Sequence, residues 1–121
     1  WHCKFSSGAA PGNRVKDLYE VCGQAQKSTK WTWNFANLVA HLTERETRHR
    51  GGRPSRFVRG SLNRLAILRK ASRRKYVVFR VGIVQPGLSK AGIGNEHLAI
   101  LGATSLFLRT VTNHPLMVVS S

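Results

Sequence analysis

Arginine is concentrated in residues 45–75, and its guanidinium is the side chain best suited to gripping phosphate. This basic stretch holds twelve of the chain's twenty Lys and Arg residues, and Glu46 is its one acid. A guanidinium can donate two parallel hydrogen bonds to phosphate oxygens. Like charges at this density repel one another unless a polyanion covers them, so the pattern predicts a polyanionic partner. The basic residues are Arg45, Arg48, Arg50, Arg53, Arg56, Arg59, Arg64, Arg69, Lys70, Arg73, Arg74 and Lys75.

Residues 50–60, inside the basic stretch, are expected to form a loop between two helices. Gly51, Gly52 and Gly60 would let the backbone come close to a ligand, and the arginines between them could grip consecutive phosphates. Most contacts in a protein–DNA interface go to phosphate and sugar. We therefore predict binding to nucleic acid, with DNA as a more favoured partner than RNA. The alternative, a solvated charged face, usually mixes both signs of charge.

Aromatic rings gather just before the second expected helix. Trp31, Trp33 and Phe35 alternate with polar residues. An exposed Trp can stack on a nucleic-acid base, which makes Trp31 and Trp33 candidates for base stacking. Packing in the core or at its edge is the interpretation that we favour.

A second group of residues could do acid–base chemistry. His41 and Glu44 share one face of an expected helix, and His49 follows them. These three residues would carry the reaction if the chain were a metal-independent nuclease. The zinc-binding spacing His-Glu-x-x-His does not occur, however, and Glu44 can pair with Arg48 one turn later. We favour a solvated helix face and predict no catalytic residue.

Carboxylates are too scarce for a metal-dependent nuclease, which needs clustered acids to hold Mg²⁺. Cys3 and Cys22 are too far apart in the sequence for a zinc knuckle. They are expected to be reduced thiols in a cytoplasmic protein. We therefore predict neither a metal nor a cofactor. The acidic residues are Asp17, Glu20, Glu44, Glu46 and Glu96.

The motif QPGLSKAG, residues 85–92, could bind a single anion. It lies after an expected strand and before an expected helix, where α/β folds commonly bind ligands. Ser89 and Lys90 could hold an anion at the helix N-terminus. A plain connection between strand and helix is an equally good interpretation, because the phosphate-loop pattern GxxxxGK[ST] does not occur.

Length and composition predict one domain with a strong positive charge. The chain has 121 residues, 41% of them hydrophobic, and a formal net charge of +15 at pH 7. This is enough for one ordinary core. No apolar run is long enough to span a bilayer, so no membrane partner is expected. Because the chain begins with Trp, we expect a single domain, residues 1–121, cut from a longer protein whose other domains are further partners.

Hydrophobic periodicity places the elements that would carry these residues. Residues 75–84 give the clearest strand signal, and Ser61 and Asn95 are the expected N-caps of two helices. The first helix is expected to bury Val15, Leu18, Tyr19 and Cys22. The last helix is expected to bury Leu98, Leu101, Phe107 and Leu108. The expected helices are 14–28, 34–48, 61–71 and 96–111, and the expected strands are 1–5, 75–84 and 116–120.

The last three elements predict the fold class. A strand, a helix and a second strand in this order make a βαβ unit with parallel strands. We therefore expect an α/β fold, with a small and mostly parallel sheet, flanking helices and a C-terminal βαβ unit.

The VQPGLSK turn and the Leu-rich helix after it carry a resemblance to known proteins. Residues 83–119, about a third of the chain, resemble the C-terminal end of large bacterial proteins with helicase-like or nuclease-like neighbours. Those proteins look like defence or DNA-processing systems. The resemblance implies an accessory domain of such a machine, and it carries over no catalytic residue.

These observations leave four functions open. The first choice is a non-catalytic DNA-binding module of a bacterial defence or DNA-processing protein. A structural RNA-binding protein of the ribosomal type is the second. A nuclease using the His41 and Glu44 group is the third, and a module that binds an acidic protein is the fourth.

Overall fold

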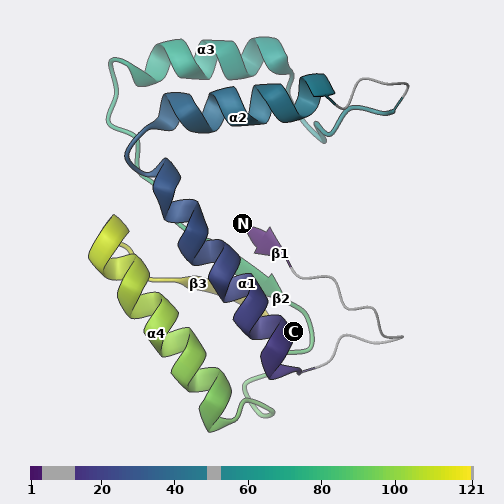
Figure 1. Cartoon of the computed structure of the whole chain (residues 1–121), viewed down its shortest axis with the longest axis vertical. Helices are drawn as coiled ribbons and strands as arrows, with labels where there is room; N and C mark the ends of the chain where they lie inside the picture. Colours follow the sequence, from purple (N-terminus) through teal and green to yellow (C-terminus); the bar gives the residue numbers. More distant parts are fainter. Residues whose placement is uncertain (4–12, 49–52, 121) are drawn as a thin grey trace. The chain divides into compact units, whose positions relative to one another are not determined.

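The chain forms two compact units. The computed structural model describes residues 1–3, 13–48 and 53–120. The sheet unit comprises Trp1–Lys30 and Phe79–Ser121, and the hairpin unit comprises Trp31–Val78 (Figure 1). The whole basic stretch therefore lies in the hairpin unit.

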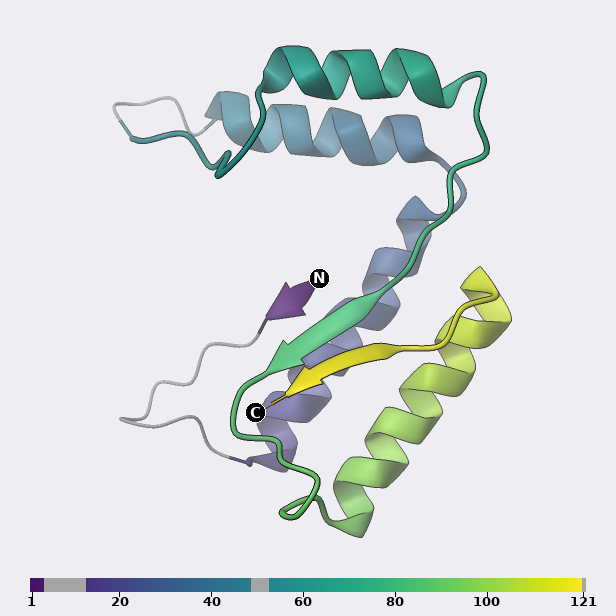
Figure 2. The ribbon, with the colours of Figure 1, turned by 180° about the vertical axis from the view of Figure 1, so that it is seen from behind.

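The sheet unit contains the expected parallel sheet. Its strands β1 (His2–Cys3), β2 (Gly82–Gln85) and β3 (Met117–Ser120) follow the order β1-β2-β3, and both pairings are parallel. Ile83 pairs with His2 on one side and with Val118 on the other. Helix α4 (Asn95–Thr112) connects β2 to β3 (Figure 2). The α/β class and the C-terminal βαβ unit are thus confirmed.

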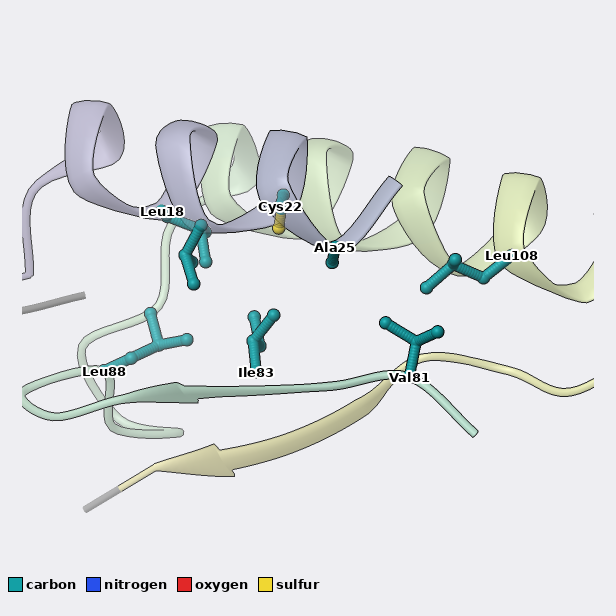
Figure 3. Packing of buried hydrophobic residues seen from close by; sticks show 8 residues of the cluster. Leu18, Cys22, Ala25, Val81, Ile83, Leu88 and Leu108 are labelled. Carbon is teal, nitrogen blue, oxygen red and sulfur yellow. The ribbon is translucent and has the colours of Figure 1, made fainter. Parts of the chain in front are cut away.

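The core of this unit lies between the sheet and two helices, α1 (Val15–Lys27) and α4. Figure 3 shows both helices on the same side of the sheet. Residues spaced at helical periodicity on α1 meet residues of and around β2 there. The buried cluster is Leu18, Val21, Cys22, Ala25, Val81, Ile83, Leu88 and Leu108. Burial raises the pKa of the Cys22 thiol, and a hydrogen bond with Thr104 opposes that shift.

Some residues expected in this core are exposed. Tyr19 is 70% exposed, because the buried face of α1 is centred on Leu18 and Cys22. On α4, Leu98 and Phe107 are also exposed. Two polar residues of α4, His97 and Thr104, are buried instead. The Thr104 hydroxyl accepts a hydrogen bond from Gln26 Nε2 at 3.2 Å. His97 and Thr104 are spaced with Leu101 and Leu108 along one face.

The strand expected over residues 75–84 is much shorter and lies later in the chain. Only Gly82–Gln85 pairs with other strands, and Tyr76 and Val78 are exposed. A β-strand needs hydrogen-bonded neighbours, and the partner strands β1 and β3 reach only Gly82–Gln85. A Cβ at Gly82 would lie 2.3 Å from the Trp1 ring, so glycine allows this ring to cover β2.

The hairpin unit consists of two helices. Helices α2 (Phe35–Arg48) and α3 (Leu62–Ser72) lie side by side and antiparallel in Figures 1 and 2. The Ser61 hydroxyl accepts a hydrogen bond from the Arg64 N–H at 3.3 Å, which confirms the expected N-cap. The N-cap of α4 is Gly94 rather than Asn95, which is already helical.

The two units differ in how much apolar surface they bury. Among the described residues of the hairpin unit, Val39 is the only buried hydrophobic side chain, and α3 has no buried residue. Ile67 and Leu68 of α3 are more than half exposed. Within the ranges that the structure describes, no helix is both long and apolar enough to cross a membrane.

Candidate nucleic-acid interface

Every basic residue of residues 45–75 that the structure describes is exposed. Arg50 lies outside the described residues. The hairpin unit holds twelve basic residues against two acidic ones, a formal net charge of +10 within the chain's +15. The side chains predicted to bind nucleic acid thus gather in one small unit with its cations at the surface.

One of the two acids, Glu44, forms the expected ion pair with Arg48 one turn later. The Glu44 side chain is 55% exposed and the Arg48 side chain is 77% exposed. Ion pairs at such exposure stabilise a protein by at most about 1 kcal/mol. This pair therefore leaves Arg48 available to a stronger anionic partner.

The other acid, Glu46, organises the loop that follows α2. Glu46 is 7% exposed, although it lies within the basic stretch. Its carboxylate accepts a hydrogen bond from the Ser55 hydroxyl at 2.6 Å and one from the Arg56 backbone N–H at 3.1 Å. The Ser55 hydroxyl in turn accepts one from the Phe57 N–H at 3.1 Å. These bonds tie the loop to the last turn of α2.

Arginines from two segments gather around this buried carboxylate. A hollow of about 280 Å³ is lined by Arg45 from α2 and by Arg56 from the loop, together with Glu46. A second hollow of about 430 Å³ extends from Arg53 to the first turn of α3. Its lining residues are Glu46, Arg53, Ser55, Phe57, Gly60, Ser61, Leu62 and Asn63. Hydrogen bonds thus hold residues 55–57 against α2, and Arg45, Arg53 and Arg56 line the two hollows.

Arg59 is exposed in the loop before α3, and the other basic residues follow α3 and its C-terminal end. Arg64 lies in the first turn, Arg69 and Lys70 in the last, and all three are exposed. Arg73, Arg74 and Lys75 continue the charge beyond the helix and are exposed as well.

The two tryptophans proposed for stacking have different surroundings. The Trp31 ring stacks on the His41 ring, with 5.0 Å between the centroids and 27° between the planes. Trp33 is 79% exposed. Our preference for core or edge packing is therefore wrong for Trp33, because the turn before α2 directs its ring away from the small core.

Two of the residues proposed for acid–base chemistry have other partners in the described chain. His41 contacts Trp31, and Glu44 contacts Arg48. His49 lies outside the described residues. Across residues 1–3, 13–48 and 53–120, no three His, Cys, Asp or Glu side chains come together as metal ligands would.

The candidate anion site at Ser89 and Lys90 belongs to the sheet unit, whereas the basic stretch belongs to the hairpin unit. The Ser89 hydroxyl accepts a hydrogen bond from the Gly92 N–H at 3.0 Å, so it braces the turn before α4. At the start of that helix, His97 Nδ1 accepts from the Gly94 N–H at 3.3 Å. Lys90 is exposed. This geometry fits the alternative that we described, a plain connection between strand and helix.

Comparison of the chain with protein-family models, curated proteins and solved structures finds no match. The function must therefore be inferred from the side chains of the hairpin unit.

Two residues of this surface have roles that sequence reasoning did not assign. Tyr76 is 93% exposed, although it lies in the stretch interpreted as a buried strand. Glu46 accepts a hydrogen bond from the Arg56 backbone N–H. In the sequence, the one indication of such a role is that Glu46 is the single acid among twelve basic residues.

Proposed function

We propose that the hairpin unit binds nucleic acid through the sugar–phosphate backbone, with DNA as the first candidate, and that it serves as a non-catalytic module of a larger DNA-processing protein. The carrying observation is the exposure of every described basic residue in a unit whose formal charge is +10. A solvated surface mixes both signs of charge, whereas this one is nearly of a single sign.

The engagement of the two acids also supports this proposal. Glu46 is buried under the loop and hydrogen-bonded to it, and Glu44 is paired with Arg48. Both carboxylates are therefore engaged within the hairpin unit, and most of its arginines keep an unneutralised positive charge. Binding then consists of phosphate contacts with guanidinium groups, which release condensed counterions.

The loop is the part of the surface best prepared for phosphate. Glu46 fixes the backbone at Arg56, so this segment needs little ordering when it binds. We expect the double variant Arg53→Ala with Arg56→Ala to bind duplex DNA at least about tenfold more weakly, a loss of about 1.4 kcal/mol. Titration of a labelled duplex by fluorescence anisotropy at fixed salt measures this loss.

The matched control is Lys16→Ala with Arg109→Ala, which removes the same charge from exposed positions in the sheet unit. The affinity of this control variant for the duplex is expected to fall less than about threefold, because the variant changes only the long-range electrostatic attraction. Equal losses in both double variants would mean that binding follows net charge and not the hairpin surface. Melting curves check folding, and unfolding of the Arg53 and Arg56 variant would show these arginines to be structural.

Salt dependence tests the same contacts without a mutation. If about six phosphates are gripped, affinity should fall roughly 10³-fold between about 50 and 200 mM salt. A log–log slope shallower than about −2 would contradict a phosphate grip. RNA of matched length, titrated in parallel, distinguishes the RNA-binding alternative.

A further inference from the structure

One end of the α2–α3 hairpin combines exposed aromatic rings with basic residues. Because α2 and α3 are antiparallel, residues just before α2 and residues just after α3 lie at the same end (Figures 1 and 2). Trp33 stands two residues before α2, and Tyr76 stands four residues after α3. Trp33 is 79% exposed and Tyr76 is 93% exposed.

The backbone around both rings is turned by hydrogen bonds. The Asn34 N–H donates to the Trp31 carbonyl at 3.3 Å, which places Trp33 inside a turn. After α3, the Arg74 N–H donates to the Ala71 carbonyl at 3.1 Å. The Lys75 N–H donates to the Ser72 carbonyl at 3.4 Å, immediately before Tyr76. The chain therefore holds these rings at the surface near its own cations.

Aromatic rings beside cations suit unpaired bases. A base in a single strand offers a π-face for stacking, whereas a duplex hides those faces between neighbouring base pairs. Arg73, Arg74 and Lys75 lie in the segment between α3 and Tyr76 and can contact the backbone of the same strand. Large rings left in water also gain stability when a base covers their apolar surface.

We propose that the hairpin unit takes single-stranded nucleic acid, with Trp33 and Tyr76 stacking on its bases. This proposal rests on the function proposed above and names its substrate class. The loop that carries Arg53 and Arg56 lies at the opposite end of the hairpin, about 20 Å away along α2. One strand running between the two ends would contact both the arginines of the loop and the two rings.

The test compares two probes on the whole chain: a single-stranded oligo(dT) of about twelve nucleotides and a duplex of the same length. Because each ring is proposed to stack on one base, Trp33→Ala with Tyr76→Ala should weaken oligo(dT) binding at least about tenfold. Duplex binding should change less than about twofold, because its bases are already stacked. Trp33→Phe with Tyr76→Phe keeps an aromatic face at both positions and should restore most of the oligo(dT) affinity.

The matched control is Tyr19→Ala, which removes a ring that is 70% exposed in the sheet unit and should leave both affinities unchanged. An equal loss on both probes, or no loss on oligo(dT), would overturn the stacking proposal while leaving the phosphate grip in place. Failure of the unmodified chain to bind either probe would overturn both proposals. Melting curves of the double Ala variant must match the unmodified chain, since a lower melting temperature would assign these rings to the fold.

Discussion

At the scale of single residues, the hairpin unit distinguishes two glutamates that stand two positions apart. Glu44 is exposed and meets Arg48 in water, where an ion pair contributes little. Glu46 is buried and accepts hydrogen bonds from Ser55 and Arg56. Hydrogen bonds to a charged group contribute more to stability than those between neutral groups. The same residue type therefore has a surface role at one position and a structural role at the other.

This difference gives a prediction. Glu46→Ala should lower the free energy of unfolding of the hairpin by about 1–3 kcal/mol, because the Ser55 and Arg56 donors lose their acceptor. It should also weaken DNA binding, although it removes a negative charge, since the loop loses its fixed shape. Glu44→Ala is the matched control and should cost less than about 1 kcal/mol. Stronger DNA binding by Glu46→Ala would show that its charge matters more than its hydrogen bonds.

At the scale of elements, α3 has little packing to stabilise it. It has no buried residue, and the side chains of Ile67 and Leu68 are more than half exposed. Local interactions therefore carry much of its stability. The Ser61 cap is the clearest of these, because it satisfies the Arg64 N–H.

We expect Ser61→Ala to destabilise α3 by about 1 kcal/mol. The backbone amides of α3 should then exchange with solvent about fivefold faster, since 1 kcal/mol is about that factor in the open population. Ser61→Asn keeps a capping oxygen and should exchange like the unmodified chain. Unchanged exchange in Ser61→Ala would assign the stability of α3 to its contacts with α2.

At the scale of the whole molecule, the two units divide core and charge between them. The sheet unit holds the buried cluster around Ile83 and Leu18, while the hairpin unit buries one described hydrophobic side chain, Val39. The hairpin unit also carries most of the positive charge, which repels itself. A small core and strong repulsion together predict that the hairpin unit is the less stable part.

Hydrogen exchange of the intact chain checks this expectation. Amides of α2 and α3 should exchange faster than those of α1 and β2 when no nucleic acid is present. Addition of oligo(dT) should slow exchange in α2 and α3 and leave β2 unchanged, since a ligand stabilises the part that it contacts. Equal protection of both units in the free chain would contradict the division that we describe.

Several parts of this architecture could be predicted from local pattern. The helices of the chain follow from apolar spacing, and the Ser61 cap follows from residue type. The parallel sheet follows from the order of its last strands and helix. The concentration of basic residues at one surface follows from their concentration in residues 45–75, because charged side chains stay in water.

Features that depend on contacts between distant parts of the chain were decided by the tertiary structure alone. Residues 76–81 have strand-like composition, but a strand needs neighbours, and the reach of β1 and β3 confines pairing to Gly82–Gln85. Burial of Glu46 depends on a loop that returns to α2, and exposure of Trp33 and Tyr76 depends on a hairpin with almost no core. Composition and periodicity determined the helices and the charge, because both are local properties of the chain. Pairing, burial and the meeting of distant side chains were decided by the fold, because each requires contacts that no single stretch contains.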